Sequence, residues 1–75
     1  MNEDPKYVLK AFGNHLKQLR TAKRLTQVDL EVNCGVNNCD ISKIEQGKLN
    51  ITFTSLTRLA RGLDLALWEL VKFQE

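Results

Sequence analysis

The stretch TQVDLEVNCGVNNCDISKIEQ, residues 26–46, decides the fold of this 75-residue chain. Thr26 is a favourable helix N-cap, and the spacing that follows predicts a short helix over residues 27–33. Gly35 ends this helix, because glycine adopts a positive φ angle without steric penalty. The apolar positions of this helix are Val28, Leu30 and Val32.

A second short helix is predicted over residues 38–45. Asn37 is its N-cap, Ile41 and Ile44 form its inner side, and Gly47 closes it as a left-handed residue. Val36 in the turn is expected to fill the core. Two short helices therefore flank a glycine-containing turn, an arrangement that an ordinary helical bundle does not require.

Three further helices are predicted around this unit. The first begins at Asp4-Pro5 and ends near residues 23–24, with Gly13 inside it at a cost of roughly 1 kcal/mol relative to alanine. The fourth begins behind Thr52, and the fifth is rich in leucine; no convincing strand pattern is present. We therefore predict an all-α fold, a compact five-helix domain that takes in residues 1–75 as one unit. The apolar residues that mark these three helices are Val8, Leu9, Phe12, Leu16, Leu19; Phe53, Leu56, Leu59, Ala60, Leu63; and Leu65, Leu67, Trp68, Leu70, Val71.

The charges are unevenly distributed, although eleven Lys and Arg against nine Asp and Glu leave a net charge of only +2. The basic residues fall mostly in the first two thirds of the chain, which indicates a basic face. No segment approaches the roughly 20 apolar residues of a membrane-spanning helix, and the N-terminus lacks the apolar run of a signal peptide. A cytoplasmic protein without membrane contact is expected.

Several kinds of site are not expected from the composition. Cys34 and Cys39 form no CxxC pair and have only His15 as a nitrogen ligand, so a four-ligand zinc site cannot be assembled, and both thiols are expected to be reduced. We also expect no cofactor, no small-molecule ligand and no enzymatic activity, because the chain lacks a glycine-rich phosphate loop and a paired catalytic histidine. His15 is expected at the surface or against the backbone.

The outward side of the second short helix carries polar groups suited to a nucleic acid. A helix that enters the major groove needs polar side chains near its N-terminus and apolar side chains behind them. Residues 38–45 meet this requirement. The outward residues are Asn38, Cys39, Ser42 and Lys43.

Three sequence patterns in this unit are Leu25-Thr26-Gln27-x-x-Leu30, Gly35-Val36 and Ile41-Ser42-x-Ile44-Glu45-x-Gly47-Lys48. Together they resemble the Cro/C1-type (XRE family) helix-turn-helix DNA-binding domain, which has a lambda-repressor-like fold. The resemblance extends to Phe12-Gly13-x-x-Leu16-x-x-Leu19-Arg20 and to residues 50–63, so that it covers roughly residues 8–72. The chain is similar in size to restriction-modification controller proteins and to phage repressors. The resemblance implies a transcriptional regulator whose partner is double-stranded DNA.

The resemblance also implies roles for individual residues. The residues that it implies contact bases are Asn38, Cys39, Ser42 and Lys43. Those that it implies contact phosphates are Gln27, Lys48 and Asn50. Arg20 and Glu45 match a family pair that joins the first helix to the recognition helix. Two residues depart from the family pattern: Glu31 replaces a small alanine, and Cys39 places a weak thiol donor at a base-reading position.

Association as a homodimer on a pseudo-palindromic operator is expected, because one short recognition helix reads only a few base pairs. The apolar fifth helix is the expected interface, through Leu67, Trp68 and Val71. The alternative is a protein-interaction module, such as an antitoxin-like domain with secondary or lost DNA binding, which Glu31 and Asp40 favour. A second alternative, less favoured, makes Cys39 a redox sensor.

Overall fold

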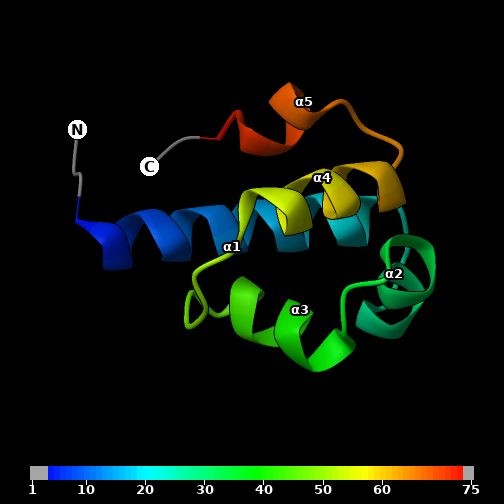
Figure 1. Cartoon of the computed structure of the whole chain (residues 1–75), viewed down its shortest axis with the longest axis horizontal. Coiled ribbons are helices and arrows are strands. Elements are labelled where there is room, and N and C mark those ends of the chain that lie inside the picture. Colours follow the sequence, from blue (N-terminus) through cyan, green and yellow to red (C-terminus); the bar gives the residue numbers. More distant parts are fainter. Residues whose placement is uncertain (1–3, 74–75) are drawn as a thin grey trace.

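The computed structural model describes residues 4–73, and all of its regular structure is helical. The helices are α1 (Pro5–Ala22), α2 (Gln27–Cys34), α3 (Asn38–Glu45), α4 (Phe53–Gly62) and α5 (Leu67–Val71). The long α1 runs through the middle of the molecule, with α2 and α3 on one side and α5 on the other (Figure 1). The predicted all-α, five-helix fold is confirmed.

The helix starts follow the capping residues that the sequence contains. Asp4 Oδ1 accepts from the Lys6 amide at 2.8 Å, in front of Pro5 at the first helical position. Thr26 and Asp29 form a reciprocal capping box, which holds the pKa of the Asp29 carboxyl below its usual range through its hydrogen bond from the Thr26 amide. At the starts of α3 and α4, side-chain oxygens of Asn37 and Thr52 accept from the backbone amides of Cys39 and Ser55.

Three helices end in the same turn, in which one residue adopts a left-handed conformation. After α3 this residue is Gly47, and the amides of Gly47 and Lys48 bond to the carbonyls of Ile44 and Lys43. The equivalent residues after α1 and α4 are Arg24, with φ 59°, and Asp64, with φ 57°. A residue with a side chain is strained in this conformation, and glycine is not. Only the turn at Gly47 was therefore evident from the sequence.

The core is formed by one or two residues from each helix, together with Val36 in the turn and Leu63 directly after α4. Its fully buried members are Leu16, Leu30, Ile41, Leu59, Leu63 and Leu70. Of the three apolar residues predicted for α2, only Leu30 is buried, because Val28 and Val32 are 56% and 79% exposed. A helix advances 100° per residue, so Val28 and Val32 share a face opposite Leu30, whose buried companion is Cys34. Phe53, at the start of α4, is likewise exposed.

Gly13 has a packing role that sequence propensity did not reveal. It is buried in α1 where this helix crosses α3, and a Cβ at this position would lie 2.7 Å from the Glu45 carbonyl oxygen and closer still to that of Ile44. The predicted helical penalty of glycine is therefore offset by a close approach of the two backbones. Some predicted boundaries shift by one or two residues: α1 ends at Ala22, α2 extends to Cys34, and α5 begins at Leu67.

Candidate DNA-binding interface

The two short helices and their turn form the expected helix-turn-helix unit. Gly35 takes a φ of 78° with no atom near its missing side chain, and Val36 is buried beneath the turn. Ile41 and Ile44 anchor the inner side of α3. On its outer side Cys39, Asp40 and Lys43 are exposed and Asn38 and Ser42 are partly buried, so this side is polar.

An ion pair between Arg20 and Glu45 fixes α3 from behind. Arg20 Nε and Nη2 donate to Glu45 Oε2 and Oε1 at 2.6 and 2.9 Å, and both residues are buried. Arg20 Nη1 also donates to the Leu25 carbonyl at 2.7 Å, so the guanidinium holds the end of α1, the following loop and α3 together. Its hydrogen bond with Glu45 raises the pKa of Arg20. The pair expected from the sequence is thus present in the structure.

Gln27, expected to contact phosphate, adds a third side chain to this ion pair. Its Nε2 donates to Glu45 Oε1 at 3.1 Å, and the residue is partly exposed at the start of α2. An amide nitrogen carries two hydrogens, so this bond leaves one donor for an outside acceptor. Gln27 is therefore oriented by the same carboxylate that fixes α3.

Glu31, one of the two departures from the family pattern, accepts hydrogen bonds from the first residue of α3. Its Oε1 accepts from the Asn38 amide at 3.1 Å and from Asn38 Nδ2 at 2.5 Å. The next amide of α3, that of Cys39, is bonded to Asn37 Oδ1 at 2.7 Å. Sequence reasoning identified Glu31 as an anomaly but missed this partner, because seven residues and a turn separate the two positions.

The other candidate contact residues lie along the far half of α3 and the loop after it. Lys43, Lys48 and Asn50 are exposed, whereas the Ser42 hydroxyl accepts from Gln46 Nε2 at 3.0 Å. The Lys48 amide bonds to the Lys43 carbonyl at 2.9 Å, so the turn at the end of α3 fixes the spacing between the two lysine backbones. Gln46, which is exposed and orients Ser42, was not anticipated from the sequence.

The two cysteines lie in contrasting environments. Cys34 is buried against Gly62 of α4, its sulfur accepts from the Val36 amide, and burial raises the pKa of its thiol. Cys39 is exposed on the outer side of α3, and both thiols are free. Of the two, only Cys39 is placed to meet a partner.

The opposite side of the molecule, around α5, exposes apolar side chains. Trp68 is 63% and Val71 44% exposed, whereas Leu70 is completely buried. Leu67 is partly buried against the core, so Trp68 and Val71 form most of the exposed part of the expected interface. None of the helices within residues 4–73 is long and apolar enough to cross a membrane.

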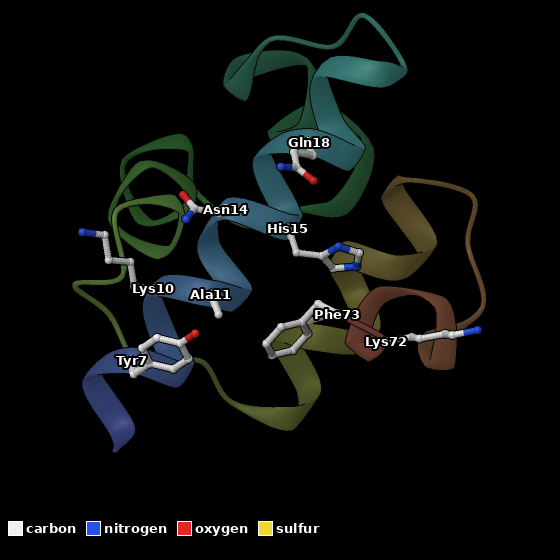
Figure 2. A pocket seen from close by; sticks show the side chains of 8 residues that line it. All are labelled: Tyr7, Lys10, Ala11, Asn14, His15, Gln18, Lys72 and Phe73. Carbon is white, nitrogen blue, oxygen red and sulfur yellow. The ribbon is translucent and has the colours of Figure 1, made fainter. Parts of the chain in front are cut away.

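Next to α5, a hollow of about 780 Å³ separates α1 from the segment that follows α5. Figure 2 shows α1 side chains, among them Tyr7 and His15, along one wall and Phe73 across from them. His15 Nε2 lies 3.3 Å from the Glu69 carbonyl oxygen, in agreement with the expected backbone contact.

Comparison with known proteins places this geometry in a family. The helix-turn-helix domain family matches residues 11–70. Control protein C.MunI from Mycoplasma sp is 37% identical over 60 residues, which are 79% of this chain and 81% of that protein. The structure of the restriction-modification controller protein C.AhdI from Aeromonas hydrophila superposes with a TM-score of 0.80 at 35% identity, over 83% of this chain and 94% of that one.

A third relative was solved with DNA. The restriction-modification controller protein C.Esp1396I, as a tetramer in complex with its natural 35 base-pair operator, gives a TM-score of 0.78 at 28% identity, over 87% of this chain and 90% of that one. The predicted resemblance to helix-turn-helix regulators, and to controller proteins among them, is confirmed. The chain belongs to the helix-turn-helix domain family, and restriction-modification controller proteins are among its relatives.

Proposed function

We propose that this chain is a sequence-specific DNA-binding transcriptional regulator that acts as a homodimer on a pseudo-palindromic operator. The observation that carries the proposal is the polar outer side of α3, which the buried Arg20–Glu45 pair and the close approach at Gly13 hold in a fixed position. A helix presented in this way fits the major groove. The structure of C.Esp1396I in complex with its operator supports the proposal, since that protein shares the fold.

Each candidate residue has a role in this proposal. Sequence is read by base contacts and affinity is set mainly by phosphate contacts, so the two groups are separable by experiment. The polar groups on the outer side of α3 face base edges, and the residues at the start of α2 and after α3 lie where the DNA backbone passes. The proposed base readers are Asn38, Cys39, Ser42 and Lys43; the proposed phosphate contacts are Gln27, Lys48 and Asn50.

Pairing of two chains through α5 completes the operator-binding unit. Trp68 and Val71 expose apolar surface that a second copy would cover, and Leu67 supports them from the core side. A two-fold interface of this kind presents the same patch from both subunits.

We further propose that the chain binds and does not catalyse, that residues 1–75 fold as one unit, and that it acts on DNA in the cytoplasm. Three observations support the first statement: the polar side chains on the outer side of α3 are exposed or only partly buried, Glu45 is committed to Arg20, and His15 is turned towards the α5 backbone. Regulation then depends on dimerisation and on occupancy of the operator.

Selection from a random duplex library tests the function directly. The parent chain is expected to enrich a two-fold symmetric sequence. Lys43→Ala is expected to change the preferred base at one position in each half-site, with a loss of about 1 to 3 kcal/mol if the lysine binds guanine. Lys48→Ala is expected to weaken binding to all duplexes alike and to lower the salt dependence. Equal and sequence-independent losses would make Lys43 another phosphate contact.

The protein-interaction alternative has one specific observation in its favour. Val28 and Val32 expose an apolar stripe on α2, beside the proposed DNA surface. Titration of random duplex at several salt concentrations separates the two functions, because phosphate contacts produce a steep salt dependence. Absence of any binding to duplex DNA at low salt would favour a partner protein.

A further inference from the structure

The Glu31 carboxylate on α2 is hydrogen-bonded to Asn38, the first residue of α3, and so links the two helices of the helix-turn-helix unit. One oxygen, Oε1, accepts both from the Asn38 backbone amide at 3.1 Å and from Asn38 Nδ2 at 2.5 Å. Both residues are partly buried. The side chain of Asn38 is therefore held by its neighbour on α2, in contrast to the exposed side chain of Lys43 on the same helix.

The chemistry of the pair dictates which end of the Asn38 amide faces which way. An ionised carboxylate only accepts hydrogen bonds, whereas the two ends of a carboxamide differ: the nitrogen donates and the oxygen accepts. The nitrogen of Asn38 must therefore face Glu31, and the Oδ1 oxygen must face away. The partner found for Oδ1 is the exposed Cys39 thiol at 3.9 Å, a weak donor. Oδ1 thus remains available to a stronger donor on the outer side of α3.

We propose that Glu31 is a positioning residue for sequence preference: by holding Asn38 Nδ2, it makes Asn38 present an acceptor to the major groove. In that groove adenine and cytosine carry an exocyclic amino group, whereas guanine and thymine carry a carbonyl oxygen. Glu31 therefore selects adenine or cytosine at the base that Asn38 reads. This inference rests on the proposed function, in which α3 enters the major groove.

Without the carboxylate, the Asn38 amide would turn about its last torsion angle and present either end. A lysine at position 31 would reverse the preference, because an ammonium group only donates and would attract Oδ1, turning Nδ2 outwards. A glutamine at position 31 keeps a carbonyl oxygen of the same reach and would preserve the parent orientation. The three substitutions therefore predict three different outcomes at one base.

The test is selection from a random duplex library by the full chain and by its variants, followed by affinity measurements on single-base substitutions. Asn38→Ala first identifies the base that Asn38 reads, as the position whose preference disappears. At that base the parent is expected to favour adenine or cytosine over guanine or thymine by about five- to tenfold, the lower end of the discrimination from side-chain contacts to bases. Glu31→Ala should reduce this ratio to about one, Glu31→Lys should invert it, and Glu31→Gln should retain it.

A charge control separates positioning from general electrostatics. Asp40 is an exposed carboxylate in the first turn of α3, and Asp40→Asn removes the same charge from the same end of the helix. It should strengthen binding to every duplex without altering the ratio at the Asn38 base. Circular dichroism and melting temperature identify any variant that fails to fold, and Glu31→Lys and Glu31→Gln together still test the proposal if Glu31→Ala does not fold.

Two results would overturn the inference and leave the proposed function intact. In the first, Glu31→Lys and Glu31→Ala select the same base as the parent at the Asn38 position. In the second, Asn38→Ala changes no position, which would show that Asn38 reads no base. Failure of the proposed function has a different signature: the parent chain itself enriches no sequence from the library.

Discussion

The α3 side and the α5 side of this molecule are built in opposite ways. Helix α3 is capped at both ends, tied to α1 by the Arg20–Glu45 pair and seated directly on the Gly13 backbone. Helix α5 has five residues and leaves Trp68 and Val71 exposed. A polar surface that must meet a charged partner in one register benefits from rigid support behind it. The apolar surface of α5 needs no such support, because a partner that covers it buries the exposed side chains.

The largest effect is expected from breaking the ion pair that supports α3. Glu45→Ala removes the acceptor of two guanidinium hydrogen bonds and leaves a buried Arg20 charge without it, at a cost of about 3 to 5 kcal/mol. For a small domain this is a large fraction of the total free energy of unfolding. The melting temperature should fall sharply, and DNA binding should be lost through unfolding.

A double variant distinguishes a buried pair from a general loss of packing. Arg20→Met combined with Glu45→Leu replaces both charges with apolar groups and should recover much of the stability, because no charge is left buried. Thermal denaturation of the single and double variants measures this difference. A Glu45→Ala variant that melts with the parent would show that α1 and α3 do not depend on the pair.

Substitution by alanine should destabilise the α3 side of the molecule unequally at Gly13 and at Gly35. Gly13→Ala places a methyl group against the Ile44 and Glu45 carbonyl oxygens, so α3 must move away from α1 at a cost of about 3 kcal/mol or more. Gly35→Ala meets no atom but must keep a φ of 78°, which costs about 1 to 2 kcal/mol. Urea denaturation of both variants gives the comparison, and equal losses would contradict a close contact at Gly13.

On the α5 side the expected effect is on association and not on folding. Trp68→Ala should leave the melting temperature of the monomer nearly unchanged, because the side chain is mostly exposed, and should weaken dimerisation by roughly 30-fold if the tryptophan is a central contact. Sedimentation at micromolar concentration measures both states. Val28→Ala, at an equally exposed residue on the other side, is the matched control and should not alter association.

The smallest effect is expected at the end of α1, where a gain of stability is predicted. Arg24 adopts a φ of 59° in an exposed turn, and Arg24→Gly removes the strain of that conformation. The added freedom of the unfolded chain offsets part of the benefit, so a rise of less than about 1 kcal/mol is expected. A fall in melting temperature would show that the arginine side chain contributes stability there.

Local signals in the sequence were sufficient for the helices and their caps. Thr26 and Asn37 cap helices as predicted, α4 begins directly behind Thr52, and Gly35 and Gly47 adopt positive φ angles. These features depend on residues within one helical turn of each other, so the sequence alone predicts them. The apolar pattern of α2 did not reveal which face of this short helix would be covered, since Leu30 is buried whereas Val28 and Val32 are exposed.

Contacts between helices required the tertiary structure. Arg20 and Glu45 could be paired in advance only through the resemblance to a family, and the partner of Glu31 was not anticipated. The packing role of Gly13 was not anticipated, because helix propensity describes one helix and not the backbone of another lying against it. The sequence by itself thus determined the helices, their order and the polar residues of α3. Only the tertiary structure decided which of those side chains are held and which are free, because hydrogen bonds between helices depend on how the chain packs and not on the spacing along it.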